Sequence, residues 1–108
     1  MLVQADGRPL EARIAPYTDL SVHDLGADLA DHELTGAVHP TRWRTAPLWG
    51  IGYRLSRESR PTFLHDGRAR SVEEAVLWHD GEARAVRERF AQLPRAQREQ
   101  LLRFVEAL

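Results

Sequence analysis

The sequence predicts a mainly α domain in which a loop-rich first part is followed by three helices. From Ser71 onward apolar residues recur at three- and four-residue spacing, whereas the first forty residues are rich in Pro, Gly, Asp and His and show little periodicity. No convincing strand pattern and no internal repeat is present. With 108 residues the chain is one domain at most. We therefore expect 1–40 to be irregular with one short helical turn, 41–70 to be loops and 71–108 to be helical.

Composition and charge narrow the possible partners. The formal net charge of −1 gives no general reason to expect nucleic acid binding. Residues 1–40 hold seven acidic residues against two Arg, and 41–108 hold nine against thirteen. The two parts therefore carry opposite charge, and we expect them to dock on each other or on a partner. A chain this short buries a thin core, which favours a cofactor or a larger partner.

The absence of cysteine excludes several kinds of site. Disulfides, thiolate metal sites, a Cys nucleophile and covalent c-type haem attachment through Cys-x-x-Cys-His all need a residue type that this chain lacks. The N-terminus has no basic start followed by an apolar run, so no signal peptide is expected. No apolar stretch is long enough for a membrane span.

The first predicted helix begins at Ser71, which with Glu74 forms a capping box. Asp80 and Gly81 end it, because Gly favours the left-handed conformation after a helix C-terminus. One face has the i, i+3, i+4, i+7 pattern of an apolar stripe, made by Val72, Ala75, Val76 and His79. His79 is thus expected on the apolar face rather than in solvent.

Two further helices are expected after it. One spans Glu82 to Gln92, and the break at Leu93-Pro94 separates it from the last, Pro94 to Ala107. The inward side chains are predicted to be Ala83, Val86 and Phe90 in the first of these and Leu101, Leu102, Val105 and Leu108 at the end of the chain.

Three segments carry a family resemblance. They are Ile14-Ala15-Pro16-Tyr17-Thr18-Asp19-Leu20-Ser21-Val22-His23-Asp24-Leu25-Gly26, then Trp43-Arg44-Thr45-Ala46-Pro47-Leu48-Trp49-Gly50-Ile51-Gly52, and Phe63-Leu64-His65-Asp66-Gly67 with the following helix to His79. From Ile14 to Leu108 the chain resembles the C-terminal part of the bacterial di-haem oxidoreductases, also called thiol oxidoreductase-like proteins, which are related to di-haem cytochrome c peroxidases. Leu25 replaces the Met that is usual there.

The resemblance implies a partial domain, the C-terminal haem region of a periplasmic, di-haem c-type cytochrome with a cytochrome c-like fold. Electron transfer and peroxidase-like chemistry are the implied activities, with small redox proteins as electron partners. The distal axial iron ligand falls on His79, where the peroxidases place Met. A His lowers the reduction potential relative to Met. The Cys-x-x-Cys-His motif is expected in a missing upstream part of the same protein.

The resemblance also implies residues at the haem edge, in 41–70. His65, Arg68 and Arg44 are the candidates for the propionates, since Arg is well suited to carboxylates. Trp49 is the candidate for an aromatic wall. The residues themselves leave other interpretations open: His-Asp-Gly is a good tight turn in any protein, and a His on an apolar helix face is often a hydrogen-bonded core residue.

Other functions remain open. Three of the five His are followed by Asp, as in a non-haem metal site, but no His-x-x-x-His spacing is present. Ser21, His23 and Asp24 lack the Gly-x-Ser-x-Gly motif of a hydrolase. A truncated helical interaction module that has lost haem is the main alternative. A further one is non-covalent haem held by His79 and a loop His.

Overall fold

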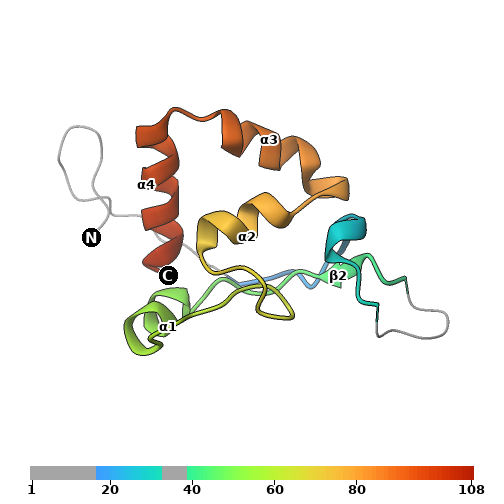
Figure 1. The fold of residues 1–108 in the computed structure, drawn as a ribbon, viewed down its shortest axis with the longest axis horizontal. Coiled ribbons are helices and arrows are strands. Elements are labelled where there is room, and N and C mark those ends of the chain that lie inside the picture. The colour runs from blue at the N-terminus through green and yellow to red at the C-terminus, as the bar shows by residue number, and fades with distance from the viewer. Residues whose placement is uncertain (1–16, 33–38) are drawn as a thin grey trace.

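The computed structural model of the chain describes residues 17–32 and 39–108. The irregular structure expected for 1–16 and 33–38 lies outside the described residues. The mainly α class is confirmed, although the described residues form four α-helices rather than three, with a small sheet. Along the chain the elements are β1 (Val22–Asp24), the 3₁₀ turn η1 (Ala27–Leu29), β2 (Arg42–Arg44), α1 (Ile51–Arg57), α2 (Val72–Trp78), the 3₁₀ turn η2 (Gly81–Ala83), α3 (Arg84–Gln92) and α4 (Arg95–Glu106) (Figure 1).

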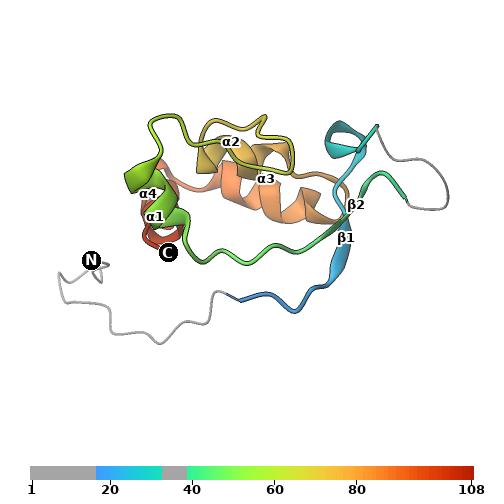
Figure 2. The same cartoon turned by 90° about the horizontal axis from the view of Figure 1, so that it is seen from below.

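The short antiparallel sheet overturns the expectation that no strand forms. His23 of β1 pairs with Trp43 of β2, and Val22 pairs with Arg44. Each strand is three residues long, which is too short for an alternating pattern to be visible in the sequence. The turn η1 is the one short helical turn expected before residue 40. Beyond β2 the chain runs along the molecule towards α1 (Figure 2).

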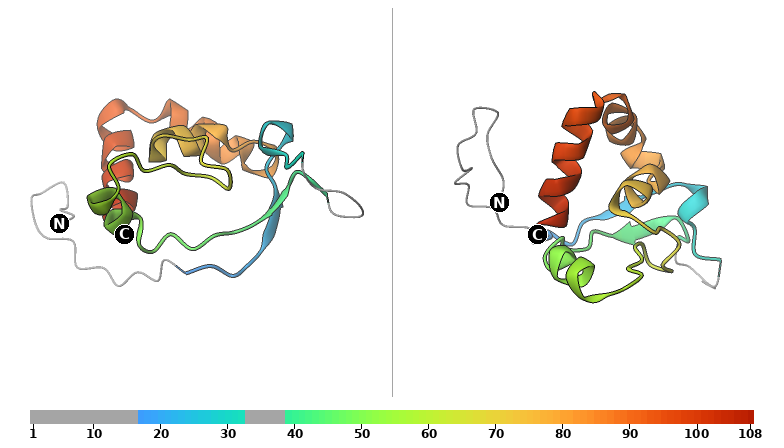
Figure 3. Two further views of the ribbon diagram at one scale, coloured as in Figure 1. Left: turned by 60° about the horizontal axis from the view of Figure 1, so that its bottom comes forward. Right: turned by 60° about the vertical axis from the view of Figure 1, so that its left-hand side comes forward.

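Helix α1 falls inside the segment that we predicted to be loops. Gly50 precedes it with φ +80°, and Gly52 lies within it, so the sequence lacks the propensity of a helix here. The structure shows why Gly52 suits this position: a Cβ added there would lie 2.7 Å from the carbonyl oxygen of Glu106. The Gly50 amide also donates to the Leu108 carbonyl at 2.9 Å. These contacts hold α1 against the end of α4 (Figure 3).

The core is small and lies where the turn between α1 and α2 meets three helices. Phe63 and Ala69 form a β-bridge, and together with Val72 they are the buried cluster. Partly buried side chains from α1, α2 and α4 surround it, including Leu55, Trp78, Leu102 and Val105. The inward positions predicted for Leu102 and Val105 are therefore confirmed.

Helix α2 begins as the sequence predicts. The Ser71 side chain accepts a hydrogen bond from the Glu74 amide at 3.0 Å. The Glu74 carboxylate accepts from the amide of Arg70 at 2.8 Å, one residue before the amide used in a standard capping box. The helix ends at Trp78, with His79 as its C-cap, and Gly81 has φ +58°.

Ser71→Ala is expected to lower the free energy of unfolding by about 1 kcal/mol, because the Glu74 amide loses its partner. Urea unfolding followed by circular dichroism measures the difference. Ser59→Ala is the matched control, since Ser59 is exposed in the bend after α1. Equal effects of the two substitutions would contradict the assigned cap.

Helices α3 and α4 agree with the predicted spans to within two residues, but two of their predicted core positions are wrong. Phe90 is buried as expected, whereas Val86 is 61% exposed and Leu101 is 43% exposed. Both line a shallow apolar groove with Phe90 and Leu93. Helices α3 and α4 cover each other only partly, so the apolar side chains of Val86 on α3 and Leu101 on α4 stay exposed. No described helix has the length and apolar character that a membrane crossing needs.

Candidate functional site

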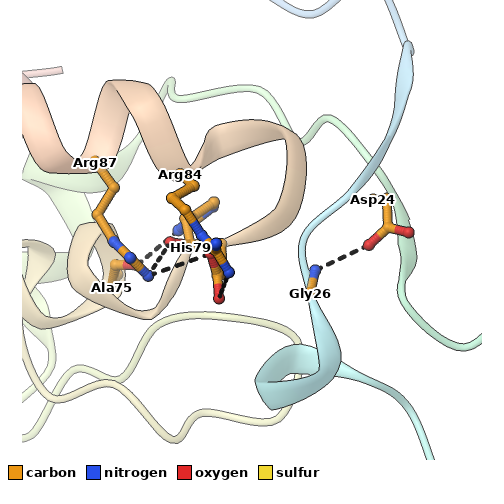
Figure 4. A network of polar contacts seen from close by, with 7 residues as sticks. Asp24, Gly26, Ala75, His79, Arg84 and Arg87 are labelled. Carbon is orange, nitrogen blue, oxygen red and sulfur yellow. Dashed lines mark hydrogen bonds and ion pairs between the residues drawn. The ribbon is translucent and has the colours of Figure 1, made fainter.

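The half-buried His79 side chain lies at the end of α2, where the chain leaves the helix. Its backbone turns to an extended conformation, with φ −66° and ψ 131°. The imidazole Nδ1 lies 2.7 Å from the carbonyl oxygen of Ala75, one turn earlier (Figure 4). A carbonyl only accepts, so Nδ1 carries the proton in this hydrogen bond, and in the neutral form of the ring Nε2 has the free lone pair. The residue thus presents one nitrogen that can bind a metal.

A group of charged side chains fixes the backbone around His79. Arg87 donates from Nη1 to the His79 carbonyl at 3.0 Å, and the same guanidinium lies 3.6 Å from the Asp80 carboxylate. Arg84 donates from Nε to Asp80 at 2.6 Å. The hydrogen bond from Arg84 lowers the pKa of Asp80, and the positive charge of Arg87 adds to this. The turn that follows the imidazole is therefore held from α3.

A second group combines aromatic and basic side chains, and we call Trp43, His65, Arg68 and Trp78 the aromatic–basic cluster. The His65 ring stacks on Trp43 with 4.0 Å between centroids and 24° between planes. The Arg68 guanidinium lies 5.0 Å from the centroid of the Trp78 ring. Asp66 links the two halves, because its carboxylate accepts from Arg68 Nε at 2.8 Å and lies 3.9 Å from His65 Nε2.

The cluster is anchored to η1 through backbone carbonyls. The Trp43 indole N–H donates to the Leu29 carbonyl at 2.9 Å. Arg68 donates from Nη1 to the carbonyl of Asp28. Arg68 thus joins the turn at 63–69 both to η1 and to Trp78 at the end of α2. Because Trp78 directly precedes His79, the cluster lies next to His79 in the chain.

The Asp66–Arg68 pair makes stability depend on pH. The hydrogen bond from Arg68 lowers the pKa of Asp66 below its ordinary value of 3.8. A lowered folded-state pKa means that the contribution is present above the unfolded value and is lost as pH falls through the folded value. We expect Asp66→Asn to have a lower Tm than wild type at pH 6, with the two Tm values converging below pH 3.8. A Tm difference that is constant from pH 6 to pH 3 would contradict this.

The predicted haem-edge residues do not all meet. His65 and Arg68 lie together around Asp66, as described above. Arg44 follows Trp43 in β2, and because successive side chains of a strand point to opposite faces, its side chain lies away from the one that stacks on His65. Trp49 is 58% exposed and makes an edge contact with Tyr17 at 5.1 Å. It lies two residues before α1, and α1 and the turn after α2 lie toward opposite sides of the ribbon (Figure 1).

Three residues of this region were not among the predicted site residues. Trp43 and Trp78 provide the aromatic faces for His65 and Arg68, and Arg87 binds the His79 carbonyl. The position of Trp78 beside His79 was a usable signal. Nothing in the sequence marks Arg87 among fifteen arginines. Within residues 17–32 and 39–108, no group of three His, Asp or Glu converges as a metal site.

The described residues form a small, mainly helical fold in which the His79 imidazole lies at a helix end, next to an aromatic and basic surface. The chain belongs to the di-haem oxidoreductase family: the family model described as "di-haem oxidoreductase, putative peroxidase" matches residues 8–108. No curated protein and no solved structure matches the chain. The family is one of oxidoreductases and implies haem as cofactor.

Proposed function

We propose that this chain is the C-terminal haem-binding region of a di-haem c-type cytochrome that transfers electrons and supports peroxidase-like chemistry in the periplasm. His79 would bind the haem iron through Nε2. The observation that carries the proposal is the 2.7 Å hydrogen bond from Nδ1 to Ala75. A ligating His generally donates its other ring N–H to a carbonyl or carboxylate, which fixes the ring and its tautomer.

The donor chemistry fits haem. When bound, haem would supply one-electron transfer, and a His ligand to its iron would favour a lower potential than Met does. The role of this chain is to orient the imidazole of His79. Arg87 and the end of α2 hold the His79 backbone. The role that follows is electron transfer through a haem of low reduction potential.

The aromatic–basic cluster supports contact with the haem edge. Arg68 and His65 provide N–H donors for a carboxylate, and Trp43 and Trp78 provide flat apolar faces. Arg68 is already bound to Asp66, so a propionate would share this guanidinium or displace the Asp66 carboxylate. The haem contacts proposed for Arg44 and Trp49 stay predictions, supported by the resemblance alone.

Covalent attachment would come from another segment. This sequence contains no Cys, so we propose that a Cys-x-x-Cys-His motif in an upstream part of the same protein would attach the haem and that its His would also bind the iron. We propose this part as the main partner, and small redox proteins as electron partners.

The test is the intact mass of the native gene product, measured together with haem staining of a denaturing gel. We expect a species several times heavier than 12.3 kDa that retains covalent haem. A bare 12.3 kDa product without haem would overturn the proposal and favour the non-catalytic interaction module.

A further inference from the structure

Two sequence motifs that lie more than fifty positions apart contact each other in the fold. They are His23-Asp24-Leu25-Gly26 and His79-Asp80-Gly81-Glu82, and we call their contact the motif interface. The Asp80 amide donates to the Leu25 carbonyl at 3.1 Å. The residue after the proposed iron ligand is thereby tied to the chain that leaves β1.

Glu82 is the side chain that joins the two motifs. One carboxylate oxygen, Oε2, accepts from the Asp24 amide at 3.0 Å and lies 3.0 Å from Nδ1 of His23. Both the His23 and the Glu82 side chains are about half exposed, at 51% and 55%. The bridge is therefore one carboxylate oxygen with two contacts at the surface, and it connects β1 with η2.

Glycine allows the backbones to approach at this point. A Cβ added to Gly81 would lie 2.9 Å from the Gly26 amide nitrogen and closer still to the Asp24 carbonyl oxygen. A Cβ added to Gly26 would lie 2.9 Å from Cβ of Asp80. Gly26 and Gly81 both have positive φ, and the Gly26 amide is held by the Asp24 carboxylate at 2.9 Å (Figure 4). The contact is thus tight on both sides.

We propose that Glu82 is a positioning residue for His79 and acts through the motif interface. His79 is a helix C-cap, and the ends of helices fray unless the following residues are held. On the far side of His79, the Glu82 carboxylate provides this support by binding β1, and the Asp80 amide does so by binding Leu25, directly after β1. The inference rests on the proposed role of His79 as iron ligand, and it adds the residue that keeps the ligand in place.

The first arm of the test needs no haem. In the 108-residue chain, Glu82→Ala is expected to speed hydrogen exchange of the Asp24 and Asp80 amides roughly five- to tenfold, because a charge-assisted acceptor is lost. Glu106→Ala is the matched control, since Glu106 is an exposed carboxylate at the end of α4. Unchanged exchange at both amides would show that Glu82 does not hold the interface, and would overturn the inference.

The second arm uses the full-length haem protein. Glu82→Ala is expected to convert part of the iron from low spin to high spin and to shift its reduction potential. Glu82→Gln should restore most of the low-spin signal, because its side-chain oxygen still accepts from the Asp24 amide. Faster amide exchange in Glu82→Ala with an unchanged spectrum and potential would overturn the positioning role.

Two further variants keep the outcomes separable. If Glu82→Ala lowers the folded fraction, His23→Ala provides the milder test, because it removes one of the two contacts of the carboxylate. It should give a smaller increase in amide exchange and a smaller change in the spin state and reduction potential of the iron. No change in either measurement would overturn the inference. Failure of the proposed function itself is recognised differently, by a His79→Ala protein that keeps its low-spin spectrum.

Discussion

His79→Ala is expected to abolish the six-coordinate, low-spin signal of the haem served by this chain in the full-length protein. In its neutral form the His79 imidazole offers Nε2 as an unprotonated nitrogen, since Nδ1 donates to the Ala75 carbonyl. Alanine has no donor atom, so water or no ligand would occupy the iron position. Optical and electron paramagnetic resonance spectra of the oxidised protein measure the change.

The matched control is His32→Ala, because His32 is exposed in the loop after η1. Its spectrum should equal that of wild type. Added imidazole should restore the low-spin signal of His79→Ala, since it supplies the missing nitrogen to an open position. An unchanged spectrum of His79→Ala would refute the ligand assignment while leaving the family membership intact.

Leu29→Ala is expected to lower the free energy of unfolding by about 2–4 kcal/mol, the range for a Leu truncated in a packed core. Leu29 is only 2% exposed, and it is the largest fully buried side chain of the described residues. Its carbonyl also accepts the Trp43 indole N–H. In a small domain with a total stability of about 5 kcal/mol, this loss would leave only about 1–3 kcal/mol of stability.

Leu101→Ala provides the comparison for Leu29→Ala, since the same atoms are removed from a side chain that is 43% exposed. We expect a loss below about 1 kcal/mol, because little apolar surface leaves a packed site. Urea unfolding monitored by circular dichroism gives both values. Similar losses at the two positions would show that η1 is not part of the stabilising core.

The helices at the C-terminus could be predicted from the sequence because their signals are local. Ser71 and Glu74 mark a start three residues apart, and Pro94 separates α3 from α4. Which faces are buried was less predictable. Val86 has the spacing of a core residue, but none of the described elements covers it, because coverage depends on packing rather than on periodicity.

The first part of the fold depends on contacts between distant residues. The strand pair joins His23 to Trp43, and no short-range pattern encodes a pairing twenty positions apart. Helix α1 was not predicted because Gly52 has a low helix propensity. The reason for a glycine there is its close approach to the Glu106 carbonyl, which only the structure shows. Such positions satisfy packing at the expense of local propensity.

The candidate site also combines local contacts, which the sequence could predict, with contacts between distant elements, which it could not. The sequence placed His79 at a helix end, and the hydrogen bond to Ala75 one turn earlier is local. The stacking of His65 on Trp43 and the Arg87 contact with the His79 carbonyl join separate elements, so they needed the structure. The link from Glu82 to β1 belongs to this second kind.

The reduction potential of the full-length protein with His79→Met, compared with wild type, tests the ligand assignment most directly. A thioether ligand raises the potential of haem iron relative to imidazole while keeping it low spin. If His79 binds the iron, the potential of one haem rises and its spectrum changes from bis-His to His–Met coordination. If both haem potentials and both spectra stay as in wild type, His79 is not the ligand, and the account of this site is wrong.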